Sequence, residues 1–168
     1  MSAAPVLFGL TALGVFHTAV GIVALAAGVG AYAIEREIRV DTSLGRLYIA
    51  FTFVTAVTAL GIFQHGGFGP PHVLALLTLA ALAVGLVAAA GVFGRLSRAI
   101  AAVAFASTVL FHLIPTVTES LTRLPLGAPL VASQEAPIFP PIYGALFVLF
   151  LIGVGLQLRG LRAAAPSR

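Results

Sequence analysis

Four histidines, each near one end of a long hydrophobic segment, are the residues of this sequence best suited to chemistry. Imidazole rings on separate helices at one depth can hold a cofactor inside a bundle, and haem b needs two of them with small neighbours. We expect His17 and His112 to be the axial ligands of a single haem b. A zinc or copper ion instead requires three or four imidazole or carboxylate ligands. The candidates for such a metal site are His17, His65, His72, His112 and Glu119.

Less specialised roles stay open for each of these side chains. His65 and His72 flank a turn rich in glycine and proline, where a histidine is commonly just a polar residue in contact with water. If the site forms, these two border its outer rim, where they would contact haem propionates or a quinol headgroup. The alternative for His17 and His112 is interhelical hydrogen bonding to a serine, a threonine or a backbone carbonyl. For Glu119 the alternative is solvation.

The composition indicates an integral membrane protein. Of the 168 residues, 60% are hydrophobic and 8% are charged, which leaves too little polar surface for a water-soluble fold. Because there is no cysteine, disulfides, thiolate metal sites and covalently attached c-type haem are excluded. All nine basic residues are arginines beside the hydrophobic segments. We interpret them as topology signals and expect no binding of nucleic acid.

Five segments approach or exceed the roughly 20 apolar residues that a helix needs to cross a bilayer. Their predicted ranges are 5–34, 47–65, 71–93, 99–117 and 141–158. Short connections join the first four, a long proline-rich loop is expected at 118–140, and an inner tail follows at 159–168. The charged connection 35–46 is expected to contain a solvated turn. The first segment is too long for a cleaved signal peptide, so we expect it to stay in the protein.

The arginines orient the predicted helices, because positively charged loops are retained in the cytoplasm. With the N-terminus outside, eight of the nine arginines lie on the inner side and only Arg123 lies outside, which predicts an N-out, C-in topology. At about 1.5 Å per helical residue, the four histidines lie roughly 21–34 Å from the inner boundary of a hydrocarbon core about 30 Å thick. All four are therefore expected near the outer face.

The positions of the histidines indicate a repeat of two hairpins, 5–65 and 71–117. In each hairpin the first helix has a histidine near its outer start and the second has one near its outer end. Such duplication typically builds a bundle with a site at the repeat interface. We therefore expect a single all-α membrane domain, 1–168, with a four-helix core and a peripheral fifth helix. Small residues that share a helical stripe with His17 would let a flat cofactor approach: Gly14, Gly21, Ala24 and Gly28.

Two short motifs mark the first two predicted helices. Residues 17–28 contain His-x3-Gly-x2-Ala-Leu-x2-Gly, and residues 44–48 are Leu-Gly-Arg-Leu-Tyr. Together they resemble an uncharacterised family of prokaryotic predicted membrane proteins, whose members often have a His-Arg pair where this chain has Asp41-Thr42. The resemblance implies a small multi-span fold without an established activity. With the lysine-free composition, it predicts the cytoplasmic membrane of a prokaryote as the location.

The expected function is electron transfer or quinol oxidoreduction by a membrane protein that binds haem b, or a metal, near its outer face. One alternative is a non-catalytic accessory or structural subunit of a membrane complex, and another is a mononuclear zinc or copper protein. The expected partners are the lipid bilayer and a quinone or redox partner protein, within a homo-oligomer or a larger complex. Transport is disfavoured, because the inner halves of the predicted helices carry few polar residues.

Overall fold

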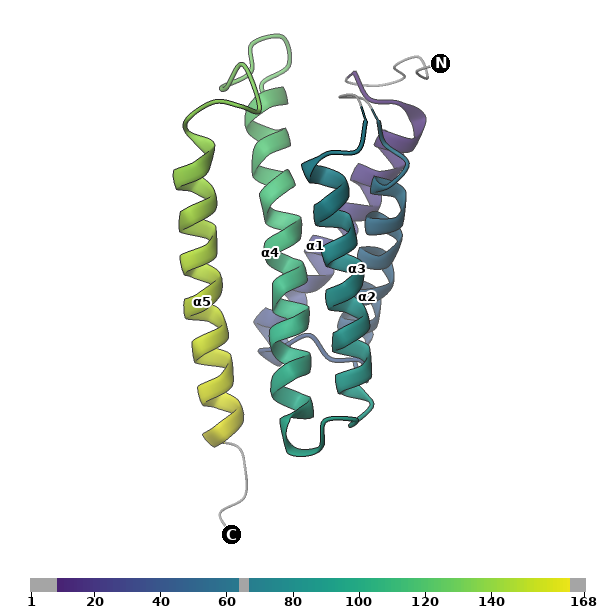
Figure 1. The fold of residues 1–168 in the computed structure, drawn as a ribbon, viewed down its shortest axis with the longest axis vertical. Coiled ribbons are helices and arrows are strands. Elements are labelled where there is room, and N and C mark those ends of the chain that lie inside the picture. The colour runs from purple at the N-terminus through teal and green to yellow at the C-terminus, as the bar shows by residue number, and fades with distance from the viewer. Residues whose placement is uncertain (1–8, 64–66, 164–168) are drawn as a thin grey trace.

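The computed structural model describes residues 9–63 and 67–163, which form five α-helices and their connections (Figure 1). The helices are α1 (Ala12–Glu35), α2 (Ser43–Ala59), α3 (Pro70–Ala89), α4 (Ser97–Arg123) and α5 (Phe139–Ala163), with a short 3₁₀ helix η1 (Gly94–Leu96) before α4. The prediction of an all-α chain with five helices is confirmed for this part of the sequence.

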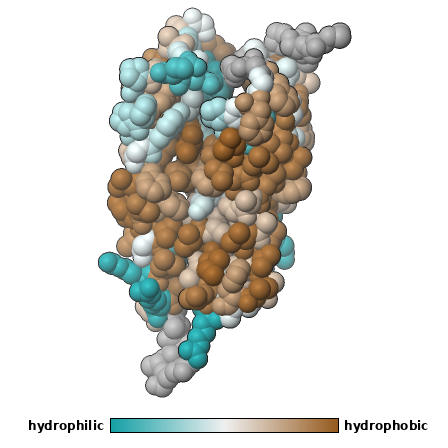
Figure 2. Space-filling model, viewed as in Figure 1, coloured by the Kyte–Doolittle hydropathy of each residue, from teal (hydrophilic) through white to brown (hydrophobic). Residues whose placement is uncertain are grey.

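Four of the helices, α1, α3, α4 and α5, are long and apolar enough to cross a membrane. The 17 residues of α2 make a shorter apolar helix, about 25 Å long. Figure 2 shows hydrophobic surface around the middle of the molecule and hydrophilic residues toward both ends. This distribution suits a hydrocarbon layer bounded by two polar interfaces, as a multi-pass membrane protein requires.

The second helix is shifted relative to its predicted range, 47–65. It begins four residues earlier because the side chain of Thr42 accepts a hydrogen bond from the Gly45 N–H (3.2 Å) and caps the helix. It ends at Ala59, so the predicted helix is also too long at its C-terminus. His65, one of the candidate ligands, lies outside the described residues.

The fourth helix is longer than predicted and continues through Pro115 to Arg123, six residues past the predicted end at 117. A proline inside a helix has no N–H to donate, and its ring crowds the carbonyl four residues earlier, yet the helix continues beyond this position. In the following turns the hydroxyls of Thr116 and Thr118 donate to the carbonyls four residues earlier, at 2.7 and 2.8 Å. The long loop therefore begins at residue 124 and not at 118.

The helices pack largely in chain order. α1 and α2 form one hairpin, α3 and α4 form a second, and α2 packs against α3 to join them. α5 packs against α4 and stands at the edge of the molecule (Figure 1). α1 and α4 make only light contact, so the seam between them is the loosest side of the first four helices.

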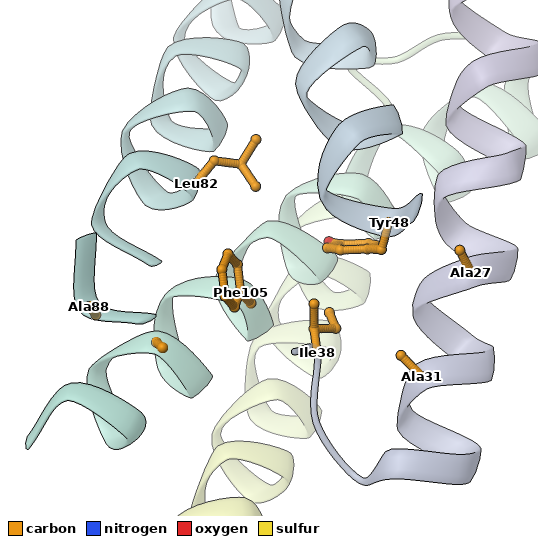
Figure 3. Close-up of a cluster of buried hydrophobic side chains, with 8 residues drawn as sticks. Ala27, Ala31, Ile38, Tyr48, Leu82, Ala88 and Phe105 are labelled. Atoms are coloured by element: carbon orange, nitrogen blue, oxygen red, sulfur yellow. The ribbon is translucent and has the colours of Figure 1, made fainter. Parts of the chain in front are cut away.

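The two ends of the bundle differ in charge. The end formed by residues 36–46, by η1 with the start of α4 and by the last turns of α5 carries seven arginines, and we call it the basic end. The opposite end, which includes His72 at the start of α3, is called the histidine end. The main apolar core lies toward the basic end and includes Tyr48 and Phe105, which are almost fully buried (Figure 3). Each ring packs against a glycine of a neighbouring helix, Gly28 and Gly85 respectively.

The connection between α1 and α2 closes the basic end of the bundle. The chain reverses at Arg36, which has a left-handed backbone conformation (φ 64°), and the next two residues turn inward. Ile38 joins the apolar core (Figure 3), and the Glu37 carboxylate accepts a hydrogen bond from the Arg98 guanidinium at 2.6 Å. Glu37 is only 6% exposed, so the prediction of a solvated turn is wrong at this residue.

Candidate functional site

A stripe of hydroxyl groups runs along one face of α2. Tyr48, Thr52, Thr55 and Thr58 follow one another at spacings of four, three and three residues, which places them on one side of a helix. The first three are buried. Both α1 and α4 direct a histidine toward this stripe, so α2 is the element that positions the site.

His17, on α1, is fixed to α2 through one ring nitrogen. Its Nδ1 lies 3.0 Å from the Thr55 carbonyl oxygen and 3.1 Å from Thr58 Oγ1. The carbonyl can only accept, and the Thr58 hydroxyl donates to backbone carbonyls of α2. Nδ1 must therefore be the donor, and in the neutral ring Nε2 carries the free lone pair. Histidines that bind metals are oriented in this way, with one nitrogen hydrogen-bonded and the other free to coordinate.

His112, on α4, is buried and reaches α2 through its other nitrogen. Its Nε2 lies 3.1 Å from Thr52 Oγ1. Its ring and that of Tyr48 are arranged edge to face, with 6.2 Å between the ring centroids and an angle of 62° between the planes. The Tyr48 hydroxyl lies 2.6 Å from Thr108 Oγ1, and because Thr108 donates to the Phe105 carbonyl, Tyr48 is the donor to Thr108. Helix α4 is thus tied to the hydroxyl stripe at two levels.

The structure therefore brings His17 and His112 to the same helix from opposite sides of the loose α1–α4 seam. Their contacts on α2 are three to six residues apart, which corresponds to roughly 5–9 Å along the helix. The interhelical hydrogen bonds expected as the alternative role are present for both rings. For His17 they leave Nε2 without a hydrogen-bond partner within residues 9–63 and 67–163.

His72 has a different environment from the other two described histidines. It is 4% exposed, and its ring is stacked between Phe63 and Phe68, with centroid distances of 4.6 and 5.1 Å. Its Nδ1 accepts a hydrogen bond from the Gly69 N–H at the start of α3 (3.2 Å), while Nε2 has no partner in the described part of the chain. His72 thus packs inside the α2–α3 turn and is not the water-exposed residue that its position suggested.

Glu119 makes its side-chain contacts at the end of α4 and in the loop that follows. Its carboxylate accepts hydrogen bonds from Arg123, one helical turn away, and from the side-chain amide of Gln134 (2.8 Å) in the loop after α4. Across residues 9–63 and 67–163, no three histidine or acidic side chains come together as a metal site. The four candidate metal ligands in this part of the chain, His17, His72, His112 and Glu119, therefore do not form one cluster, and the fifth, His65, lies outside it.

Tyr48 connects α2 to α4 beside His112, a role that was not predicted from the sequence. The signal was available in the spacing of Tyr48, Thr52 and Thr55, which is that of one helical face. Spacing along one helix does not, however, identify the partner of Tyr48 on α4, which is Thr108. Comparison with protein families, curated proteins and solved structures finds no match for this chain.

Proposed function

We propose that the chain is an integral protein of a prokaryotic cytoplasmic membrane, with the histidine end outside and the basic end inside. The four long apolar helices support the insertion, and α2 with its flanking turns would provide a fifth, shorter span. The seven arginines of the basic end support the orientation, because arginine-rich loops are retained in the cytoplasm. The N-terminus would then be outside and the C-terminus inside.

We further propose that His17 and His112 bind haem b between α1 and α4, in the outer half of the membrane, for electron transfer. The observation that supports this most is the anchoring of His17, because its Nδ1 hydrogen bonds leave Nε2 free to coordinate. A haem requires two imidazoles, whereas zinc and copper sites take three or four ligands. Since no group of three candidate ligands forms among the described residues, haem is favoured over zinc or copper.

In this proposal the residues of α2 orient the ligands. Thr55 and Thr58 would keep the His17 ring in one tautomer, and Thr52 would release His112 Nε2 for coordination while remaining close to it. The loose α1–α4 seam would allow a planar group to enter with little disturbance of the two hairpins. When bound, haem would supply a one-electron redox couple. A membrane quinol or a redox protein on the outer face would be its partner.

The experiment that tests the haem proposal is a comparison of optical spectra of purified variants. Wild-type protein from haem-sufficient cells is expected to show the Soret band of a haem with two histidine ligands. The band should be lost in His17→Ala and His112→Ala and retained in the control His72→Gln. Free imidazole should restore the band in His17→Ala, which separates loss of a ligand from misfolding. A wild-type band that survives both alanine substitutions would refute the assignment of the ligands.

The second candidate function is that of an accessory subunit of a membrane complex. It is favoured by α5, which packs mainly on α4 and leaves large side chains such as Phe147 and Leu149 exposed. In the absence of haem and metal from the purified protein, recovery of a stoichiometric partner from native membranes would support this function. Helix α5 would then be the expected contact, and crosslinking from an exposed position on it would test that.

A further inference from the structure

A groove of about 680 Å³ lies between the end of α1, α4 and α5, away from the histidine site. Its walls are apolar and include Leu110 and Leu113 of α4 and Leu146, Phe150 and Val154 of α5. On α5 its lining runs from residue 146 to residue 161, which corresponds to about 22 Å of helix. The hydrocarbon core of a bilayer is about 30 Å thick, and one leaflet is half of it. The groove is longer than one leaflet, so a single acyl chain can lie along it.

The polar groups of this groove are all at one of its ends, the basic end of the bundle. They are contributed by the last turn of α1 and the connection after it, by the start of α4, and by Gln157 of α5; the groups are Tyr32, Glu35, Arg36, Glu37, Arg98 and Gln157. A groove with apolar walls and one polar end matches an amphiphile whose headgroup lies at the basic end. A second protein helix would instead be expected to need an apolar surface along its whole length.

The charges at this end favour an anionic headgroup. Both acidic groups are engaged, since the Glu37 carboxylate pairs with Arg98 (2.6 Å) and the Glu35 carboxylate accepts a hydrogen bond from the Thr42 hydroxyl (2.6 Å). The Arg36 side chain is exposed and has no partner within the described ranges. The basic end as a whole has seven arginines and two acidic residues, Glu37 and Asp41, with Glu35 beside it at the end of α1. An exposed arginine side chain such as that of Arg36 can form charge-assisted hydrogen bonds with phosphate.

The backbone at Arg36 adds an independent indication. It is the C-cap of α1 and has a φ of 64°, a conformation in which glycine is the usual residue because a side chain adds steric cost. Its carbonyl oxygen accepts a hydrogen bond from the Gln157 amide (3.5 Å), which joins α5 to α1 across the polar end of the groove. An arginine side chain is thus placed at the rim where a glycine would be conformationally easier.

We propose that this groove binds one anionic phospholipid from the leaflet at the basic end. One acyl chain lies between α4 and α5, and the phosphate is bound by the Arg36 guanidinium, as basic pockets between transmembrane helices bind anionic lipid headgroups. The lipid fills the space between α5 and the rest of the bundle and so fixes the position of α5. The inference rests on the membrane placement proposed above and is independent of haem.

Lipid retention by the full-length protein tests this proposal. The protein is purified in mild detergent, incubated with phosphatidylglycerol or phosphatidylcholine, and the bound lipid is counted by native mass spectrometry. Wild type is expected to retain one phosphatidylglycerol. Phosphatidylcholine should be retained about tenfold less, because its choline cation cancels the net negative charge that the arginines of the basic end attract. Equal retention of the two lipids would overturn the proposal.

Three substitutions locate the site. Arg36→Gly is expected to reduce phosphatidylglycerol retention about tenfold while leaving thermal stability unchanged or higher, because glycine relieves the strained φ. Gly153→Leu, which places a large side chain in the groove, should reduce retention of both lipids. Arg95→Gln removes an arginine of the basic end outside the groove and should retain lipid as wild type does. Unchanged retention in Arg36→Gly, or a dimer that buries the groove in place of lipid, would overturn the proposal.

The same samples distinguish the failure of this inference from the failure of the membrane placement. If the protein is recovered in the membrane fraction after an alkaline carbonate wash but retains no phosphatidylglycerol, the lipid site alone is wrong. If the protein is released by the wash, the membrane placement is wrong, and the lipid site with it.

Discussion

Substituting Gly45 by alanine tests whether the α1–α2 connection packs against α2 as the structure has it. A Cβ atom at this position would lie 1.8 Å from the Arg39 carbonyl oxygen and 2.7 Å from the Arg39 nitrogen and carbonyl carbon. Cβ atoms in proteins essentially never come within 3.0 Å of such atoms. Because all three contacts are with backbone, no side-chain rotation can relieve them. To increase the separation between the added Cβ and the Arg39 oxygen from 1.8 Å to 3.0 Å, the connection must move by more than 1 Å.

The cost of this movement can be worked from what the connection holds in place. Ile38 is 3% exposed in the core, and Glu37 is buried and paired with Arg98. Loss of a buried aliphatic side chain typically costs 2–5 kcal/mol, and leaving the buried Glu37 carboxylate without its hydrogen-bond partner costs about 1–3 kcal/mol. Since the connection would shift and not be removed, we expect Gly45→Ala to lower the free energy of unfolding by about 3 kcal/mol. At roughly 2–4 °C per kcal/mol for a chain of this size, the Tm should fall by about 6–12 °C.

The assay is thermal unfolding of the purified protein in detergent, followed by circular dichroism. The matched control is Gly155→Ala on α5, where an added Cβ meets nothing within 4 Å and alanine improves helix propensity by up to about 1 kcal/mol. This control should have the wild-type Tm or a slightly higher one. A Gly45→Ala variant with the Tm of wild type would refute the close packing of the connection on α2.

Three further predictions concern the hydroxyl stripe and the charged connection. In Gly28→Ala a Cβ would lie 2.8 Å from the Tyr48 ring, and we expect a loss of about 1–3 kcal/mol in thermal unfolding; a wild-type Tm would contradict the contact. Thr52→Val leaves His112 Nε2 without its partner, so stability should fall by about 1 kcal/mol while any haem band persists, because Nε2 is released for coordination. The control Thr78→Val, whose hydroxyl bonds only its own helix, should have a smaller effect, and an equal effect would argue against an interhelical role for Thr52. Hydrogen bonding to the Arg39 guanidinium lowers the pKa of Asp41 to about 2. The stabilisation from this exposed pair is therefore present above the ordinary pKa of about 3.9 and is lost as the pH falls through 2. Arg39→Gln should return the Asp41 pKa toward 3.9 in an NMR titration, and an unchanged value would exclude the pair in solution.

The five helices could be predicted because each apolar segment is close to the length of a bilayer span or longer. Their ends could not, because they depend on local hydrogen bonds that hydropathy does not report. Thr42 caps α2 within a charged stretch that the prediction assigned to a connection, and α4 continues past Pro115 with threonine side chains bonding back to its carbonyls. The inward turn of Glu37 depends on the backbone conformation of Arg36, for which a sequence gives no signal at a non-glycine residue.

The candidate site was predictable in the same partial way. Helical spacing and depth identified His17 and His112 as residues of one region, and the structure places both against α2. The environment of His72 could not be predicted, because its stacking between Phe63 and Phe68 depends on the path of the α2–α3 turn and not on helical periodicity. The prediction from depth therefore placed His72, which packs within a turn, in one group with His17 and His112, which face the hydroxyl stripe.

The haem content of the purified wild-type protein tests the central proposal most directly. The protein is purified from membranes of haem-sufficient cells, and haem is measured as the pyridine haemochrome against protein mass from amino-acid analysis. We predict roughly one haem b per chain, since the site uses one pair of imidazoles. Protein that is folded by circular dichroism but contains no haem, even after incubation with excess hemin, would contradict the account.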